Sequence, residues 1–265
     1  NRSEIFLVMV SGMGTIAGSV MGTYIGMLGG TDPAAKVLFA THLLSASVMA
    51  VPGSIVLAKM LCPQTEEATD HVAISGKEKE NSNILDAISS GTVTGVKLMT
   101  NIAAMLLVFI SLVALANYIT EGVIGRYTGL NDWIVKITDG KAQGLTFQFI
   151  LGVITSPFMW LIGVPSQDIM LVGSLLGQKT ILNEFVAYFQ LQQWKDAGLF
   201  MYEKSILMST YILCGFANIS SIGILLGGLG VLAPEKRGLI SRIGVPAMIG
   251  GALVSVLSAT IIGMI

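Results

Sequence analysis

Cys214-Gly215-Phe216-Ala217-Asn218-Ile219-Ser220-Ser221 is the stretch that decides the fold, because it lies inside 30 consecutive residues without a charge, Ser205 to Pro234. A helix needs about 20 apolar residues to cross a membrane, so this run is long for one straight crossing. It also carries amide and hydroxyl groups, which must find hydrogen-bond partners away from water. The run therefore predicts a transmembrane helix that is broken near the middle of the membrane.

A carboxylate in similar surroundings lies a short way upstream. Glu184, in Thr180-Ile-Leu-Asn183-Glu184-Phe185-Val186, follows a long apolar stretch and opens another that is mostly apolar. An ionisable side chain at membrane depth costs roughly 2.5 kcal/mol or more, so it usually faces a cavity, a partner or a substrate. Together the two stretches predict a polar pocket within a membrane.

The composition also indicates a membrane protein. Hydrophobic residues make up 53% of the 265 residues and charged residues 12%, with a mean hydropathy of +0.76. Charge-free stretches of spanning length run over 5–31, 37–58, 98–120, 142–167, 205–234 and 243–265. A soluble domain of this size could not cover so much apolar surface. The net charge of −1 argues against nucleic acid as a partner, and the two cysteines indicate no disulfide framework.

We expect an all-α integral membrane protein built from five segments. Residues 1–61 would hold two transmembrane helices, the first over 5–30, and 62–92 a polar loop and a short interfacial helix at 83–91. Residues 93–142 would form a transmembrane helix and an external loop. Residues 143–192 would form an interfacial segment and a re-entrant hairpin, and 193–265 two transmembrane helices, the first broken. The chain begins with Asn1-Arg2-Ser3-Glu4, without an initiator Met or a signal peptide, and we therefore expect it to be a piece of a longer membrane protein.

The re-entrant hairpin is predicted from helix length. The pieces 166–177 and 180–191 would each make about 15–18 Å of helix, roughly half of a hydrocarbon core. Their tip would carry Gln178, Lys179 and Thr180 together with Asn183 and Glu184.

In the first helix, glycines recur every fourth residue, which predicts a ridge for close helix packing. They are Gly14, Gly18, Gly22, Gly26 and Gly30.

Recognition is a better explanation of the polar residues than catalysis. Enzymatic motifs are absent, and the chain contains two histidines, His42 and His71. What remains is a set of groups suited to a neutral polyhydroxylated ligand, with two aromatic rings alongside. The set is Glu184, Asn183, Asn218, Thr180, Ser220, Ser221, Phe185 and Phe216. A hairpin tip and a broken helix are the usual means by which secondary transporters build a site at the midplane.

A simpler interpretation is that these groups are structural. Glu184 would then pair with Lys179 at the hairpin tip, and Asn218 would tie two helices together. The presence of both polar stretches in one chain favours a binding site over this interpretation.

Two motifs resemble one family over essentially the whole chain. They are Lys179-Thr180-x-x-Asn183-Glu184-Phe185-Val-Ala-Tyr188 and Cys214-Gly215-Phe216-Ala217-Asn218-x-Ser220-Ser221-Ile222, followed by Gly227-Gly228-Leu-Gly230 and Ala233-Pro234. They resemble the carboxy-terminal half of the concentrative nucleoside transporters. The resemblance implies a cation-coupled nucleoside symporter, usually driven by sodium, that assembles as a homotrimer in the plasma (inner) membrane. It would be the second half of an inverted-repeat transporter, with 1–61 in the transport domain and the helix of 93–142 in the scaffold.

The resemblance also implies roles for particular residues. Glu184, Asn218 and Ser221 would bind the ribose hydroxyls, Phe216 would pack against ribose and base, and Val20 would line the base side. The hydroxyl of Thr15 and the backbone carbonyls of Thr15 and Ile16 would supply part of a sodium site, although the family more often has Ser where Thr15 stands. No further cofactor is implied.

One part of the family pattern is missing. The first hairpin, with a Gly-Gln-Thr-Glu-type tip that reads the base and completes the sodium site, does not occur in this chain. The base preference is therefore open, and we expect transport to require the N-terminal half. Two other functions also stay open: a membrane gating or structural module that moves nothing, and a proton-coupled carrier in which Glu184 itself titrates.

Overall fold

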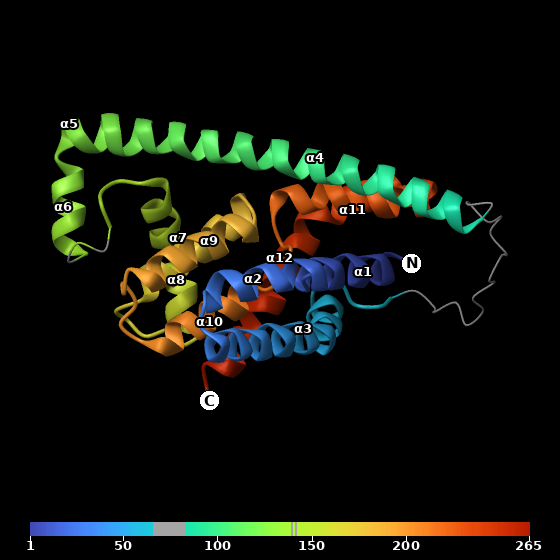
Figure 1. Cartoon of the computed structure of the whole chain (residues 1–265), viewed down its shortest axis with the longest axis horizontal. Helices are drawn as coiled ribbons and strands as arrows, with labels where there is room; N and C mark the ends of the chain where they lie inside the picture. Colours follow the sequence, from blue (N-terminus) through green and yellow to red (C-terminus); the bar gives the residue numbers. More distant parts are fainter. Residues whose placement is uncertain (66–82, 139, 141) are drawn as a thin grey trace.

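The computed structural model describes residues 1–65, 83–138, 140 and 142–265, and every regular element in this part is a helix (Figure 1). The all-α prediction is confirmed for these residues. Most of the polar loop predicted within 62–92 falls on 66–82, which lie outside the described residues. Among the described residues, three stretches are long and apolar enough to cross a membrane: Arg2–Gly29, Pro33–Leu61 and Pro234–Ile262.

The first of these stretches is not one helix. Helix α1 (Arg2–Gly14) begins at a capping box made by Asn1 and Glu4, and α2 (Gly18–Gly29) follows after three residues. Thr15 is extended, with φ −119° and ψ 167°. The prediction of a continuous helix over 5–30 is therefore wrong. Glycine on both sides of the break and a β-branched pair within it lower the cost of leaving the helical conformation.

The next helix follows its sequence signals. Helix α3 (Pro33–Leu61) starts where Asp32 accepts hydrogen bonds from the backbone N–H groups of Ala34 and Ala35, and it continues through Pro52. Pro33 stands at the first helical position, where its missing N–H costs nothing. The last long helix, α12 (Arg237–Ile262), follows a single 3-10 turn, η2 (Pro234–Lys236).

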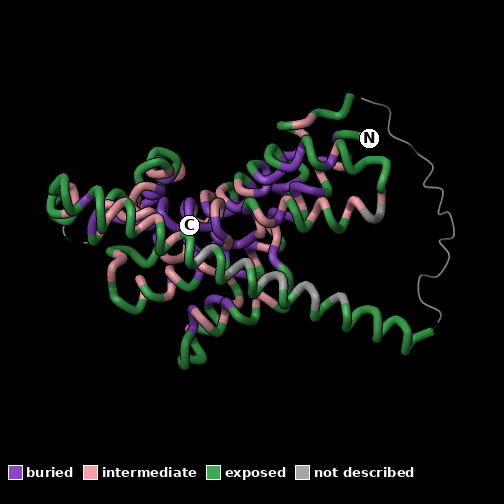
Figure 2. Tube along the Cα trace, turned by 90° about the horizontal axis from the view of Figure 1, so that it is seen from above, coloured by how far each residue is buried: buried purple, intermediate pink, exposed green. Residues whose placement is uncertain are grey.

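A single long helix replaces two predicted ones. Helix α4 (Ile84–Asn117) is capped by Asn83 and runs without interruption across 83–91 and into the predicted span at 94–120. It continues as the π-helix η1 (Tyr118–Gly125), the short α5 (Arg126–Thr128) and α6 (Leu130–Ile137). In Figure 1, α4 extends along one side of the molecule, and Figure 2 shows most of its described residues exposed. The prediction of a separate interfacial helix at 83–91 is therefore wrong.

Two shorter helices form a tight antiparallel hairpin. Helices α7 (Phe147–Leu161) and α8 (Ile169–Ile181) pack so closely that a Cβ at Gly173 would lie 2.6 Å from Thr155 Oγ1. The turn between them is fixed by Asp168, whose carboxylate accepts hydrogen bonds from the backbone N–H groups of Met201 and Tyr202 at 3.0 and 3.1 Å. Asp168 is completely buried, so this turn is held against the start of α10.

The remaining helices are α9 (Glu184–Asp196), α10 (Glu203–Leu213) and α11 (Ile219–Leu232). The predicted break in the charge-free run is confirmed, because residues 214–218 separate α10 from α11. The tip of the predicted hairpin shifts: Gln178, Lys179 and Thr180 lie inside α8, and the chain breaks at 182–183. Insertion of α8 and α9 as a re-entrant hairpin stays a prediction.

Two clusters of buried apolar residues form the interior, which is purple in Figure 2. One contains residues of α2, α9 and α10, such as Tyr24, Tyr188 and Ile212. The other contains residues of α1 and α12, such as Met13 and Val254, with side chains of α11 packed against it. Each broken helix therefore passes from one cluster to the other at its break.

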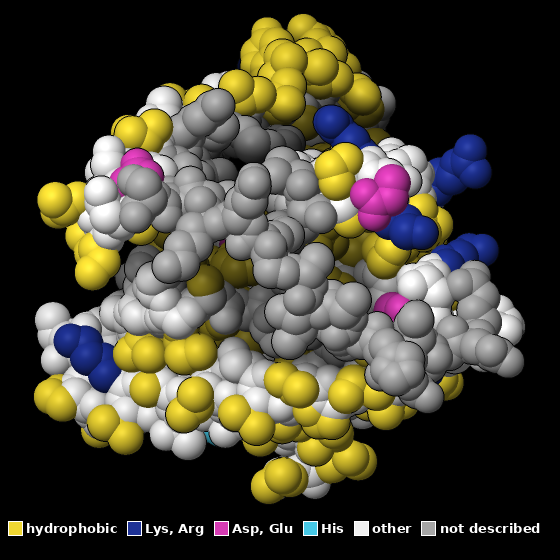
Figure 3. Space-filling model, turned by 90° about the vertical axis from the view of Figure 1, so that its right-hand side faces the viewer, with side chains coloured by type: hydrophobic (Ala, Val, Ile, Leu, Met, Phe, Trp, Pro, Cys, Tyr) yellow, Lys and Arg dark blue, Asp and Glu magenta, His cyan; other side chains and the backbone are white. Residues whose placement is uncertain are grey.

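Apolar side chains also cover the outside. On α3 alone, the side chains of Val37, Leu44, Val48, Val51, Ile55 and Met60 are at least 50% exposed. Figure 3 shows one face on which hydrophobic side chains cover much of the described surface, while most of the Lys, Arg, Asp and Glu side chains gather on one side of it. Apolar patches of this extent mark contact with lipid or with other protein. Together with the three apolar stretches of spanning length, they indicate an integral membrane protein.

Most glycines of the predicted ridge have no close neighbour in the described part of the chain. At Gly14 an added Cβ would meet Ser54 Oγ and Val254 Cγ1 at 3.2 Å, whereas at Gly18, Gly22 and Gly26 it would meet nothing within 4 Å. The prediction of close packing is confirmed at Gly14 and wrong, within the described part of the chain, along α2.

Gly215 provides a test of the fold. Its φ is +134°, and an added Cβ would lie 2.9 Å from the carbonyl oxygens of Met13 and Gly14. We expect Gly215→Ala to destabilise the protein by about 1–3 kcal/mol or more, because an L side chain is strained in this conformation. The thermal midpoint of the purified full-length protein should fall. Gly223→Ala is the matched control, since a Cβ there meets nothing within 4 Å; an equal fall in both variants would contradict this account.

Candidate functional site

The two helix breaks meet in the interior. The 2.9 Å separation between a Cβ built on Gly215 and the Met13 and Gly14 carbonyl oxygens places the α10–α11 break directly against the end of α1. The last four carbonyls of a helix have no partner within the helix, and the first four N–H groups have none either. Polar backbone groups of both broken helices are therefore concentrated in one region.

Glu184 is the first residue of α9 and is 7% exposed. Asn183 caps this helix by accepting a hydrogen bond from the Val186 N–H at 2.9 Å, which fixes where α9 begins. The Glu184 carboxylate accepts hydrogen bonds from Asn218 Nδ2 at 2.9 Å and from the Tyr24 hydroxyl at 3.4 Å. A negative charge at the start of a helix is also stabilised by the helix dipole.

Asn218 connects the two helix starts. Its side-chain oxygen caps α11 by accepting from the Ser221 N–H at 2.9 Å, and it also accepts from the hydroxyls of Ser221 at 3.0 Å and Ser220 at 2.6 Å. Its amide nitrogen donates to Glu184. A single side chain therefore binds the N-terminal end of α11 to the carboxylate at the N-terminal end of α9. The structure brings Glu184, Asn218 and Ser221 together, as their shared polarity predicts.

Tyr24 also belongs to this group, although neither sequence motif contains it. Its ring stacks on Tyr188 with the centroids 4.0 Å apart, and the Tyr188 hydroxyl donates to the Thr210 carbonyl at 2.8 Å. The available signal was its position, because Tyr24 lies four residues after Val20 and so on the same face of a helix.

The other residues predicted from the sequence divide into three sets. Phe185 is 38% exposed, and its ring centroid lies 6.4 Å from that of Tyr24. Val20 and Phe216 are both partly buried against the apolar cluster that contains Tyr24. Thr180 and Asn183 are engaged locally: the Thr180 hydroxyl donates to the Leu176 carbonyl at 2.8 Å, and Asn183 caps α9. These two side chains therefore contribute to helix geometry rather than to the polar group around Glu184.

Lys179 does not pair with Glu184, since no ion pair joins them within 4.0 Å. Its ammonium group is completely buried and donates to the Ile212 carbonyl at 2.8 Å and to Ser255 Oγ at 3.0 Å. Ser255 Oγ in turn donates to the Cys214 carbonyl at 2.7 Å. The predicted Lys179–Glu184 pair is therefore wrong, whereas the other part of the structural interpretation agrees with the structure, because Asn218 connects the starts of α9 and α11.

Thr15 and Ile16 form the break between α1 and α2. The Thr15 hydroxyl donates to the Ser11 carbonyl at 3.2 Å, and Ile16 is 8% exposed. Among the described residues no group of three or more His, Cys, Asp or Glu could hold a metal ion. The oxygens at this break are hydroxyl and carbonyl groups, which suit a hard monovalent cation, and unwound carbonyls serve this purpose in transporters.

Comparison with known proteins gives one consistent result. A family model described as the Na+ dependent nucleoside transporter C-terminus matches residues 42–263. An uncharacterized transporter of Haemophilus influenzae is 39% identical over 99% of this chain, and sodium/nucleoside cotransporter 1 of Rattus norvegicus is 38% identical over 99%. The structure of CNTnw in an inward-facing, substrate-bound state matches with a TM-score of 0.81 and 36% identity over 100% of the chain.

The chain spans only part of each of these proteins. It covers 58% of the Haemophilus influenzae protein, 39% of the Rattus norvegicus protein and 57% of the CNTnw chain. What is shown for this chain is therefore membership in the family and the fold of that part.

The Asn218 bridge can be tested by its contribution to stability. Asn218→Ala uncaps α11 and removes the shorter hydrogen bond to the Glu184 carboxylate, so we expect a loss of about 1–3 kcal/mol. Tyr24→Phe removes a bond of 3.4 Å, which is long and weak, and should cost less than about 1 kcal/mol. Thermal unfolding of both variants in the full-length protein measures the difference. A larger loss in Tyr24→Phe than in Asn218→Ala would overturn this ranking.

Proposed function

The chain belongs to the Na+ dependent nucleoside transporter family. On this basis we propose that it forms the carboxy-terminal part of a secondary transporter that carries nucleosides by symport with a cation, and we propose sodium as that cation. The protein is no enzyme, because this is a family of transporters. Helices α8 and α9 would enter the membrane as the re-entrant hairpin. The N-terminal half of the same protein would supply the residues that read the base.

The observation that carries this proposal is the buried group formed by Glu184, Asn218 and Ser221. A carboxylate has about four lone-pair positions, and Glu184 uses two of them for Asn218 and Tyr24. Vicinal ribose hydroxyls can each donate to the carboxylate and accept from the amide or the serine hydroxyl. Bonds to the charged partner are the stronger ones, so they anchor the sugar. Phe216 and Val20 would supply the apolar surface for the ring and the base.

The cation would bind at the break between α1 and α2. The Thr15 hydroxyl and the carbonyls of Thr15 and Ile16 are the proposed ligands. This break lies against Gly215, three residues before Asn218, so ordering one break orders the backbone that leads into the other. Linkage then requires that the cation and the nucleoside each raise the affinity for the other. Assembly as a homotrimer in the plasma membrane completes the proposal.

Uptake of radiolabelled uridine by the full-length protein in liposomes tests the ribose site. We expect Glu184→Gln to lower sodium-driven uptake by about 100-fold, because hydrogen bonds to a charged group are worth about 1.5–3 kcal/mol each. Glu203→Gln is the matched control, since Glu203 is an exposed glutamate at the start of α10.

Other outcomes would point elsewhere. Unchanged uptake in Glu184→Gln would remove the carboxylate from the site. No sodium-dependent uptake of any nucleoside by the unmodified protein would favour a module that moves nothing. Uptake that follows pH and ignores sodium would identify a proton-coupled carrier.

The cation site has its own test. Thr15→Val removes the hydroxyl at nearly constant volume, so the sodium concentration at half-maximal uptake should rise by about 10- to 100-fold, as expected for one bond to a charged group. Thr15→Ser keeps the hydroxyl and should stay close to the unmodified protein. Thr23→Val, at an exposed threonine of α2, controls for a general effect of valine. Equal sodium dependence in Thr15→Val and the unmodified protein would exclude the Thr15 hydroxyl as a ligand.

A further inference from the structure

Lys179 is a buried cation with neutral hydrogen-bond acceptors, and the buried carboxylate of Glu184 acts on it only at longer range, through its charge. Its side chain is completely inaccessible, and its ammonium group has two hydrogen-bond acceptors, the Ile212 carbonyl and Ser255 Oγ. Neither acceptor carries a formal charge. Burying an ammonium group is costly unless the surroundings compensate it, so a negative local field must offset part of that cost.

That field comes from the end of α10. Ile212 and Cys214 are at the carboxyl end of this helix, where the helix dipole is negative and carbonyls have no helical partner. Side chains from three other helices supply the donors. Tyr188 of α9 donates to the Thr210 carbonyl, Lys179 of α8 to the Ile212 carbonyl and Ser255 of α12 to the Cys214 carbonyl. The carbonyl groups at the broken end of α10 therefore accept hydrogen bonds from two hydroxyl groups and one ammonium group.

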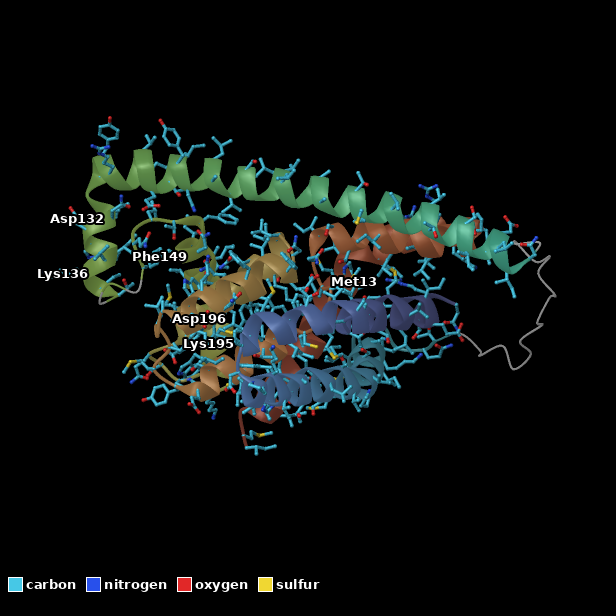
Figure 4. The ribbon with its side chains drawn as sticks, viewed as in Figure 1. Met13, Asp132, Lys136, Phe149, Lys195 and Asp196 are labelled. Carbon is cyan, nitrogen blue, oxygen red and sulfur yellow. The ribbon has the colours of Figure 1, made fainter. Side chains whose placement is uncertain are left out.

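The end of α1 has the same backbone arrangement without the charge. Helix α1 also stops at a break inside the molecule, and Figure 4 shows Met13 in this central region. In the described part of the chain the side-chain donor at this end is the Thr15 hydroxyl, on the Ser11 carbonyl, and no Lys or Arg donates there. Any positive charge at this end must come from outside the described residues.

A lysine closes another helix end in the same way. Lys195 of α9 donates to the Leu28 carbonyl at the end of α2 at 2.5 Å, and Figure 4 places Lys195 beside that region. Its side chain is 24% exposed, so it retains contact with the surroundings. Lys179 differs because it is completely buried and lies at a break.

We propose that the ammonium group of Lys179 is a permanent internal cation, occupying at the α10–α11 break the kind of position that an exchangeable cation occupies at the α1–α2 break. This inference rests on the proposed function, since it uses the cation site at Thr15. The α10 end then carries a covalently attached cation, and the α1 end is charged only when an ion is bound. Lys179 is a positioning residue that fixes the backbone leading to Asn218.

The test asks whether a free cation in solution can replace the ammonium group of Lys179. Lys179→Ala removes the charge and leaves space, and it is made in the Thr15→Val background to weaken the first site. Thermal midpoints of the full-length protein are measured in chloride salts of Na+, K+, Li+, ethylammonium and N-methyl-D-glucamine at constant ionic strength. We expect the midpoint of the double variant to be low in N-methyl-D-glucamine and to recover by several degrees in at least one small cation, beyond the response of Thr15→Val alone.

Lys179→Gln provides a second arm that does not depend on vacant space. The amide keeps most of the length and can still donate to Ile212 and Ser255, but it is neutral. We expect a midpoint several degrees below that of the unmodified protein in every salt, without recovery by any cation. A Lys179→Gln protein as stable as the unmodified one, or a Lys179→Ala midpoint equally low in all salts, overturns the proposal. If Lys179→Ala does not fold, the Gln variant alone decides.

The outcome is separate from that of the transport assays. Midpoints require no nucleoside, so a cation-specific recovery would support the internal cation even if uridine uptake failed. Conversely, sodium-driven uptake that depends on Glu184 would support the proposed function even if both Lys179 variants contradicted the inference. Lys195→Ala serves as the control, and it should lower the midpoint equally in all salts.

Discussion

The constraint on which this structure depends is that backbone polar groups released by a broken helix must be satisfied inside an apolar interior. Two helices break at one place, and several of the buried polar side chains of the described interior are found there, among them Glu184, Asn218 and Lys179. Asn218 caps the start of α11, while Tyr188, Lys179 and Ser255 supply donors to the end of α10. The polar group around Glu184 is assembled by this requirement, so the candidate site and the stability of the fold have the same physical origin.

The breaks also divide the interior. Helices α1 and α11 contribute to one apolar cluster and α2 and α10 to the other, so each chain segment that crosses between the clusters does so in a non-helical conformation. Apolar clusters pack densely and resist deformation, whereas extended segments between them can adjust their dihedral angles. The boundary between the clusters is therefore the place where binding a small group alters backbone geometry with least disturbance of the packing.

Sequence patterns predicted the features that depend on local chemistry. The charge-free run with polar groups at its centre predicted the α10–α11 break, and an isolated carboxylate with an amide downstream predicted that Glu184 and Asn218 belong together. The Thr15 break was missed because Gly14 and Gly18 suit both helix packing and helix interruption, and the choice depends on Gly215 approaching from 200 residues away. The partners of Lys179 and the role of Tyr24 were missed for the same reason, since each is decided by contacts between distant helices.

The continuity of α4 has a geometric consequence. Thirty-four helical residues at 1.5 Å each make a rod of about 51 Å, whereas the hydrocarbon core of a bilayer is about 30 Å thick. Such a rod must lean strongly away from the bilayer normal or project into the headgroup region and the water beyond it. Asp86, in the first turn, favours projection at that end. Most of the described surface of α4 is turned away from the other helices. Because α4 is longer than the hydrocarbon core is thick, it can serve as a reference for the depth of the other helices in the membrane.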